Sequence, residues 1–137
     1  MMETGLVETD MSAVVAIAML ALVEYLYFGV EVGRARVRSG LKAPAVTGDP
    51  QFERVYRAHY NTLEQLIVFL PALFAAGYYV HELYAATAGV AFLIGRAMYF
   101  RAYVRDPATR GPGFLVGMLA NLALVLGGLV GALVAAF

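Results

Sequence analysis

Apolar residues dominate four long stretches of the chain, each bounded by polar residues, glycine or proline. A helix that crosses a membrane needs about 20 mostly apolar residues. The four stretches that reach this length are 11–33, 60–80, 83–103 and 111–137, each bound being approximate. Lipid offers no partners to backbone polar groups, and the alternating strands of a membrane barrel are absent from the pattern. The sequence therefore predicts an all-α integral membrane protein, a four-helix bundle that forms a single domain over residues 1–137.

Turn-forming residues mark the connections between these stretches. Asp49 and Pro50 have the order of a helix N-cap followed by a first-turn proline, so we expect the second helix to begin near Gln51, before the membrane. Asp106-Pro107 and the Gly-Pro-Gly run at 111–113 bracket a tight connection between the third and fourth helices. With connections this short, the chain has no room for a soluble domain.

The ten basic residues lie in only two places along the chain. They occupy the first connection with its flanks and the end of the third helix with the connection after it: Arg34, Arg36, Arg38, Lys42, Arg54, Arg57, Arg96, Arg101, Arg105 and Arg110. Basic residues stay on the cytoplasmic side of a membrane protein. We therefore expect connections one and three to face the cytoplasm and both termini to face away from it. The acidic leader at 1–10 argues against a cleaved signal peptide.

Composition narrows the classes of function. Hydrophobic residues make up 61% of the chain and charged residues 15%, against about 25% in ordinary soluble domains. These proportions exclude a nucleic-acid binder of the basic-patch kind, whereas the formal net charge of zero says nothing about partners. The chain holds no cysteine, so no disulfide is expected. It holds two histidines, too few for a histidine metal centre, so no metal is expected either. Short loops and the lack of cysteine favour a bacterial inner membrane.

Arg57, Asn61 and Glu64 follow one another at helical spacing near the start of the second apolar stretch. Positions i, i+4 and i+7 share one helix face, so a cation, an amide and a carboxylate line up there. One interpretation is an arginine that snorkels to lipid headgroups within a network that stabilises the helix. The other is a site for a zwitterionic ligand, because an unpartnered carboxylate inside an apolar stretch is costly.

Two further sets of residues leave alternatives open. Arg96, Tyr99 and Tyr103 share a stripe on the third helix, which fits either an interfacial aromatic belt or a binding surface. Glu24 lies inside the first apolar stretch, where a carboxylate indicates either a functional site or a partner for Arg96 or Asn121 on another helix.

Two segments together resemble the MAPEG family, the membrane-associated proteins in eicosanoid and glutathione metabolism. Residues 52–64 read FERVYRAHYNTLE and are followed by FLPAL at 69–73, which is similar to the family's second helix. The R-x-x-Y-F-x-x-Y pattern at 96–103, with Arg110 seven residues later, is similar to the end of its third helix. The resemblance covers residues 47–117.

This resemblance implies a homotrimer that binds glutathione between neighbouring protomers at the cytoplasmic side. Arg110 matches an arginine that activates the thiol in the family. The residues that match its glutathione-binding positions are Arg36, Arg57, His59, Asn61, Glu64, Arg96, Tyr99 and Tyr103. The family also contains members that bind lipid without catalysis.

The resulting hypothesis is a glutathione transferase or peroxidase acting on a lipophilic electrophile dissolved in the bilayer. A nearby guanidinium favours the thiolate form of a bound thiol. Two alternatives remain: a lipid-binding member without catalysis, and a small proton-coupled multidrug transporter in which Glu24 carries the proton. Such transporters often show little difference in basic charge between the two membrane faces, whereas all ten basic residues here are expected on one face.

Overall fold

The computed structural model describes residues 10–137, so most of the acidic leader lies outside the described part. Four long helices make up almost all of it, and each is long and apolar enough to cross a membrane. They are α1 (Ser12–Ser39), α2 (Pro50–Tyr79), α3 (Glu82–Arg105) and α4 (Gly111–Ala136), with a short 3-10 turn η1 (Pro107–Thr109) before α4. The expectation of an all-α four-helix architecture is confirmed, although α1 and α2 extend beyond the apolar stretches by several residues.

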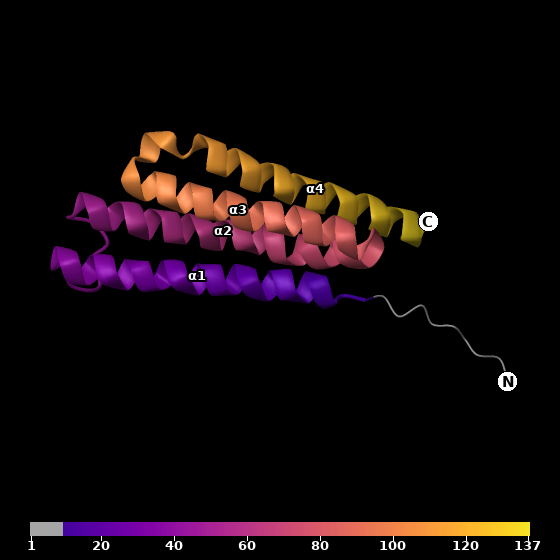
Figure 1. Cartoon of the computed structure of the whole chain (residues 1–137), viewed down its shortest axis with the longest axis horizontal. Coiled ribbons are helices and arrows are strands. Elements are labelled where there is room, and N and C mark those ends of the chain that lie inside the picture. The colour runs from indigo at the N-terminus through magenta and orange to yellow at the C-terminus, as the bar shows by residue number, and fades with distance from the viewer. Residues whose placement is uncertain (1–9) are drawn as a thin grey trace.

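The four helices lie side by side, with α2 and α3 between α1 and α4 (Figure 1). The connection at 40–49 and the one at 106–110 lie at the same end of the bundle, while the α2–α3 turn and the C-terminus lie at the other (Figure 1). We call the first of these the basic end, because all ten basic residues lie in its two connections or in the helix segments beside them. Which side of a membrane this end faces stays a prediction.

A side chain caps α2 where the sequence predicts its start, and α1 receives a cap from another helix. Asp49 accepts a hydrogen bond from the backbone N–H of Phe52 at 2.8 Å, with Pro50 in the first turn, as expected. At the opposite end of the bundle, the Glu82 carboxylate accepts a bond from the backbone N–H of Ala13 at 2.8 Å. The first turn of α1 is therefore completed by a residue of α3.

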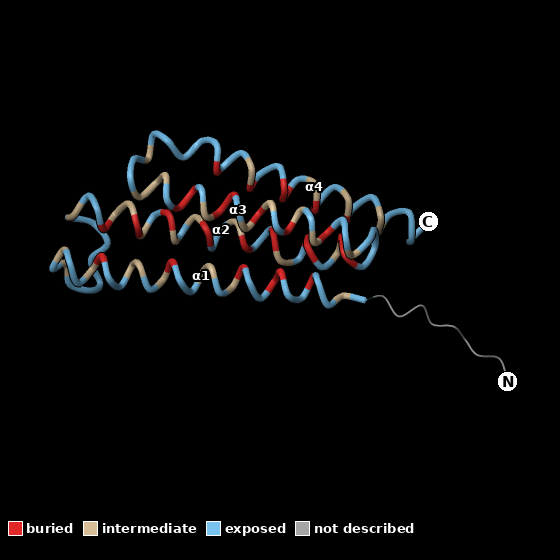
Figure 2. Tube along the Cα trace, in the orientation of Figure 1, coloured by how far each residue is buried: buried red, intermediate tan, exposed pale blue. Residues whose placement is uncertain are grey.

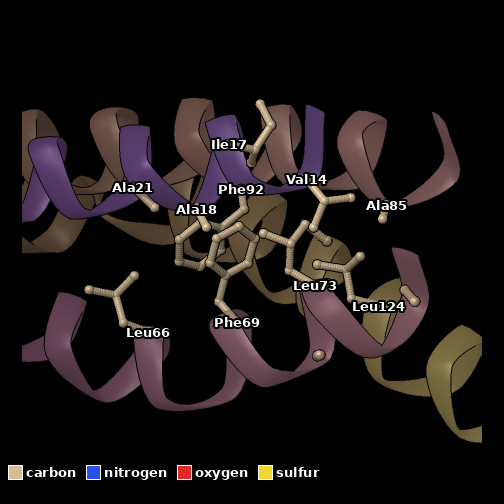
Figure 3. Close-up of a cluster of buried hydrophobic side chains, with 13 residues drawn as sticks. Val14, Ile17, Ala18, Ala21, Leu66, Phe69, Leu73, Ala85, Phe92 and Leu124 are labelled. Carbon is tan, nitrogen blue, oxygen red and sulfur yellow. The ribbon is translucent and has the colours of Figure 1, made fainter. Parts of the chain in front are cut away.

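Buried residues form a stripe along the inward face of each helix (Figure 2). In the middle of the bundle the rings of Phe69 and Phe92 stack with centroids 3.8 Å apart, between small residues of α1 such as Ala18 (Figure 3). A second cluster nearer the basic end contains Phe28 and Phe100, whose rings stack at 4.0 Å. These two aromatic pairs fix the heights of the helices relative to one another.

The contact between α3 and α4 depends on glycine. An ideal Cβ placed on Gly113 would overlap the backbone of Tyr99, with 2.7 Å to its Cα atom. A Cβ on Gly95 would lie 2.7 Å from the backbone nitrogen of Gly117. Glycines spaced four apart, as Gly113 and Gly117 are, let membrane helices approach closely, so α3 and α4 pack backbone to backbone here.

Candidate functional site

Arg96 is the charged residue at the centre of the polar part of the bundle. Its side chain is almost fully buried, with 1% exposed, although it lies within a membrane-spanning helix. One terminal nitrogen donates a hydrogen bond to Thr62 Oγ1 at 2.8 Å, and the guanidinium lies over the ring of Tyr99 at 4.3 Å. Among the described residues, its Nε finds no hydrogen-bond partner. A buried charge of this kind needs countercharge or ligand contacts close by.

Tyr99 connects Arg96 to the rest of the predicted stripe. Its ring stacks on that of Tyr103 with centroids 5.5 Å apart. Tyr99 also lies close enough to Arg110 and Glu64 for an appreciable electrostatic interaction. A carboxylate of α2 and a guanidinium at the start of α4 thus lie within electrostatic range of the α3 stripe.

Asn61 and Glu64 are joined on α2 by a hydrogen bond from Asn61 Nδ2 to a carboxylate oxygen at 3.3 Å. The amide oxygen of Asn61 is buried and has no partner among residues 10–137. We use the name three-helix cluster for the six residues that are joined by these contacts or lie within electrostatic range of Tyr99: Asn61, Glu64, Arg96, Tyr99, Tyr103 and Arg110.

Arg110 owes its position to the turn between α3 and α4. Its side chain is exposed and donates a hydrogen bond to the carbonyl oxygen of Pro107 at 2.8 Å. It immediately precedes α4, and Gly113 one turn later packs on the backbone of Tyr99. The close glycine contact thus fixes the start of α4, and with it the backbone of Arg110, against α3, at a helix N-terminus that also favours anions.

Arg57 lies one turn before Asn61 on the same face of α2, but within the described part of the chain no hydrogen bond joins it to Asn61 or Glu64. It is exposed and, together with Glu53 and Tyr60, lines a separate cavity of about 340 Å³ beside the first connection. Neither Asn61 nor Glu64 lines this cavity. Of the predicted stripe on α2, only the Asn61–Glu64 pair is directly joined.

Arg36 and His59 have partners within the same chain. Arg36 donates a hydrogen bond to the carbonyl oxygen of Ala45 at 2.8 Å and lies over the ring of Phe52 at 4.5 Å, so it fastens the first connection to α2. His59 stacks on Tyr25 of α1, with ring centroids 4.4 Å apart. Both residues therefore contribute to the packing of α1 against α2.

Glu24 is half-buried on α1 and lines a large groove between α1 and α3. It lies close enough to Arg96 to act as an electrostatic partner, one of the two partners considered for it. The other, Asn121, donates instead to the side-chain oxygen of Gln65 at 3.2 Å. Glu24 is thus placed between the groove and the buried guanidinium.

Three polar residues of this region were not predicted from the sequence. Thr62 binds Arg96, Gln65 binds Asn121, and Arg54 donates to the carbonyl oxygen of Arg105 at 3.0 Å, which ties α2 to the end of α3. A threonine and a glutamine within an apolar stretch are a weak signal for interhelical hydrogen bonds. Their partners lie 34 and 56 residues away, so the signal could not have identified them.

Comparison with known proteins gives consistent matches. The family model of MAPEG matches residues 14–130. Microsomal glutathione S-transferase 2 of Homo sapiens is 38% identical over 112 residues, covering 80% of this chain and 76% of that protein. Leukotriene C4 synthase of Cavia porcellus is 38% identical over 101 residues, covering 74% and 67%. A protein of Synechocystis sp. named uncharacterized protein sll1147 is 43% identical over 114 residues, covering 83% of each chain.

Proposed function

Because the chain belongs to the MAPEG family of integral membrane proteins, we propose that it is a glutathione transferase that activates the glutathione thiol for attack on a lipophilic electrophile. A related reaction of the same site is the reduction of a lipid hydroperoxide at the expense of glutathione. The observation that carries the proposal is the three-helix cluster, which gathers two guanidinium groups, two phenols, a carboxylate and an amide.

The chemistry of the cluster fits glutathione, a tripeptide with two carboxylates, an ammonium group and a thiol. Guanidinium groups bind carboxylates through charge-assisted hydrogen bonds, and a carboxylate such as Glu64 accepts bonds from an ammonium group. The buried amide oxygen of Asn61 has an unused lone pair beside Glu64, which suits a peptide N–H donor. The cluster thus offers possible partners to the ammonium group, to a carboxylate through Arg96 and to a peptide N–H, and it leaves Arg110 for the thiol.

Arg110 is the proposed activator of the thiol. A thiol with a pKa of about 8.5 is mostly protonated at neutral pH, and a nearby cation lowers that pKa. A decrease of one unit corresponds to about 1.4 kcal/mol and raises a small thiolate fraction nearly tenfold. The chain has no cysteine, so the only thiol in such a site is that of the bound ligand.

We further propose that a second copy of the chain completes the site, within a homotrimer. Arg36 and His59 match glutathione-binding positions of the family but pack on other faces, between α1 and α2, and Arg57, which also matches, is exposed on α2. Residues on separate faces can contribute to one site when they come from neighbouring copies around a closed symmetry axis. The basic end would face the cytoplasm of a bacterial inner membrane, and the electrophile would reach the thiolate from the bilayer.

The first test is calorimetric titration of the detergent-solubilised protein with glutathione. We expect Glu64→Ala to weaken binding, because the ammonium group loses its carboxylate, and Arg57→Ala to weaken it if the neighbouring copy supplies that arginine. Arg38→Ala is the matched control, since Arg38 is an exposed arginine at the same end that belongs to neither group. Equal affinities for the wild type and Glu64→Ala would contradict the proposed binding mode.

The second test is catalysis with an activated nitroaryl halide and with a lipid hydroperoxide, each in the presence of glutathione. Conjugation or reduction well above the uncatalysed rate is the expected result. Binding of glutathione without either reaction would instead indicate a member of the family that does not catalyse. A protein that neither binds glutathione nor accelerates these reactions would exclude the proposal.

A further inference from the structure

A groove of about 1030 Å³ runs between α1 and α3 towards the basic end. Its α3 wall contains Met98, Arg101 and Arg105, which lie on one helix face by their spacing of three and four. Tyr99 and Tyr103 project from the other side of α3. The groove is therefore separate from the three-helix cluster and lies on the opposite face of the helix that they share.

The two walls of the groove carry opposite charges. Arg101 and Arg105 are exposed on α3, and neither side chain forms a hydrogen bond or an ion pair with any residue from 10 to 137. Glu31 lies across from them on α1, with one carboxylate oxygen bonded to Arg34 at 2.6 Å and the other without a donor in the described part of the chain. The groove thus offers, within that part, two unpaired cations and a carboxylate with remaining acceptor capacity.

The stacked rings of Phe28 and Phe100 fix the relative heights of these charges. Helices α1 and α3 run in the same direction, and these two rings face each other at 4.0 Å. At about 1.5 Å per residue, Glu31 lies about 4.5 Å from this level towards the basic end. By the same rise, Arg101 and Arg105 lie about 1.5 and 7.5 Å from it, so the carboxylate falls between the two guanidinium groups in height.

Below this level aromatic and apolar side chains line the groove, with the carboxylate of Glu24 among them. Tyr27 and Met98 line it and are exposed, and the stacked phenylalanine pair forms part of its wall. Glu24 lies one to two turns deeper than the Phe28 level, on the side of the groove next to Arg96. A ligand that fits has a head with both charges and an apolar body that extends along the helices.

We propose that this groove binds one bilayer phospholipid whose headgroup carries a primary ammonium group, as phosphatidylethanolamine does. The phosphate lies between Arg101 and Arg105, because arginine binds phosphate with paired hydrogen bonds. The ammonium group donates to the free oxygen of Glu31, and an acyl chain follows Tyr27 and Met98. A lipid with a purely anionic headgroup binds less well, because the Glu31 carboxylate then faces a phosphate with no ammonium group between them. A choline lipid also binds less well, because its quaternary ammonium has no N–H to donate to Glu31.

A tryptophan placed in the groove can report on the lipid beside it, since the chain has no tryptophan of its own. Tyr27→Trp places the reporter in the groove, and Leu129→Trp, on the exposed face of α4, reports on ordinary boundary lipid. Each variant is reconstituted in phosphatidylcholine vesicles that contain equal mole fractions of a brominated phosphatidylethanolamine, phosphatidylglycerol or phosphatidylcholine. Bromine quenches tryptophan at short range, so the relative affinity of each lipid follows from the quenching.

In the Tyr27→Trp protein we expect brominated phosphatidylethanolamine to bind about fivefold more tightly than the choline lipid. This factor corresponds to a free energy of about 1 kcal/mol, the size of one favourable charge contact near a membrane surface. In the Leu129→Trp protein we expect no preference. Adding Arg101→Gln and Arg105→Gln together to the groove reporter should remove its preference, whereas adding Arg38→Gln, outside the groove, should retain it. All of these variants are checked for unchanged thermal stability before comparison.

Three results would overturn the proposal. Equal quenching of the groove reporter by all three lipids would mean that the groove has no headgroup selectivity. Stronger quenching by the glycerol lipid than by the ethanolamine lipid would mean that Glu31 does not bind the headgroup. No quenching by any lipid would mean that a second copy of the chain covers the groove. None of these results bears on glutathione binding, so this inference and the proposed function can fail separately.

Discussion

The replacement of Gly113 by alanine tests how the α3–α4 contact positions the proposed site. An ideal Cβ on Gly113 would lie 2.7 Å from Tyr99 Cα and 2.9 Å from the carbonyl carbon of Met98. Carbon atoms pack at about 3.5–4.0 Å, so the two helices must separate locally by about 1 Å. The obstructing atoms belong to the backbone of α3, which cannot turn away as a flexible side chain could.

Gly117→Ala is the matched control, one turn further along the same helix. A Cβ on Gly117 meets only the side chain of Arg96, at an ordinary distance of 3.8 Å. Alanine favours a helix over glycine by about 0.5–1 kcal/mol, and this gain is similar in both variants. The difference between them is therefore the cost of the overlap, which we expect to be about 1–3 kcal/mol in the free energy of unfolding.

The assay is reversible unfolding of both variants in mixed micelles, with helix content followed as a function of denaturing detergent. We expect Gly113→Ala to unfold at a lower detergent fraction than Gly117→Ala. Equal free energies of unfolding for the two variants would refute the reasoning. Under the proposed function, a shift of about 1 Å between Arg110 and Tyr99 should also lower the conjugation rate, by up to about a hundredfold.

Three further substitutions test single contacts. Arg110→Ala should lower the turnover of conjugation far more than the affinity for glutathione, and unchanged turnover would remove Arg110 from the mechanism. Thr62→Val leaves the buried Arg96 without its hydrogen-bond acceptor and should cost about 1–3 kcal/mol in the free energy of unfolding, whereas Thr62→Ser should restore most of it. Glu82→Ala should speed hydrogen exchange at the Ala13 amide, whereas Glu82→Gln keeps an acceptor oxygen and should slow that exchange relative to Glu82→Ala. Equal exchange rates in the wild type and both variants would mean that the cap contributes nothing.

The helices could be predicted from local signals, because the start of a helix and its apolar character depend on residues that lie close together in the sequence. The start of α2 follows from Asp49 and Pro50 alone, since a cap and a first-turn proline act on adjacent backbone groups. Four apolar stretches predicted four helices, because a membrane leaves few other solutions for the backbone. The C-terminal end of α1 was not predicted, since the helix continues past the apolar stretch to Ser39, with arginines in its last turns.

The candidate site could be predicted only in part, because helical spacing defines a face of a helix and not its neighbour. The stripe of Arg96, Tyr99 and Tyr103 was identified from spacing, and the stacked side chains agree with it. The same reasoning grouped Arg57 with Asn61 and Glu64, and the unbroken helix α2 keeps the three on one face, although Arg57 lines a cavity that the other two do not. The long-range contact between Thr62 and Arg96 depends on how α2 and α3 pack, which no local pattern in the sequence contains.

The bond from the Ala13 amide to the Glu82 carboxylate also bears on the biosynthesis of the chain. The two residues are 69 positions apart, so at about 5–20 residues per second Glu82 is synthesised roughly 3–14 s after Ala13. During that interval the first turn of α1 has to satisfy its backbone groups with water or lipid headgroups. Only two residues separate α2 from α3, so these helices emerge together as a hairpin, and the arrival of this hairpin supplies the missing acceptor before α4 packs on both helices.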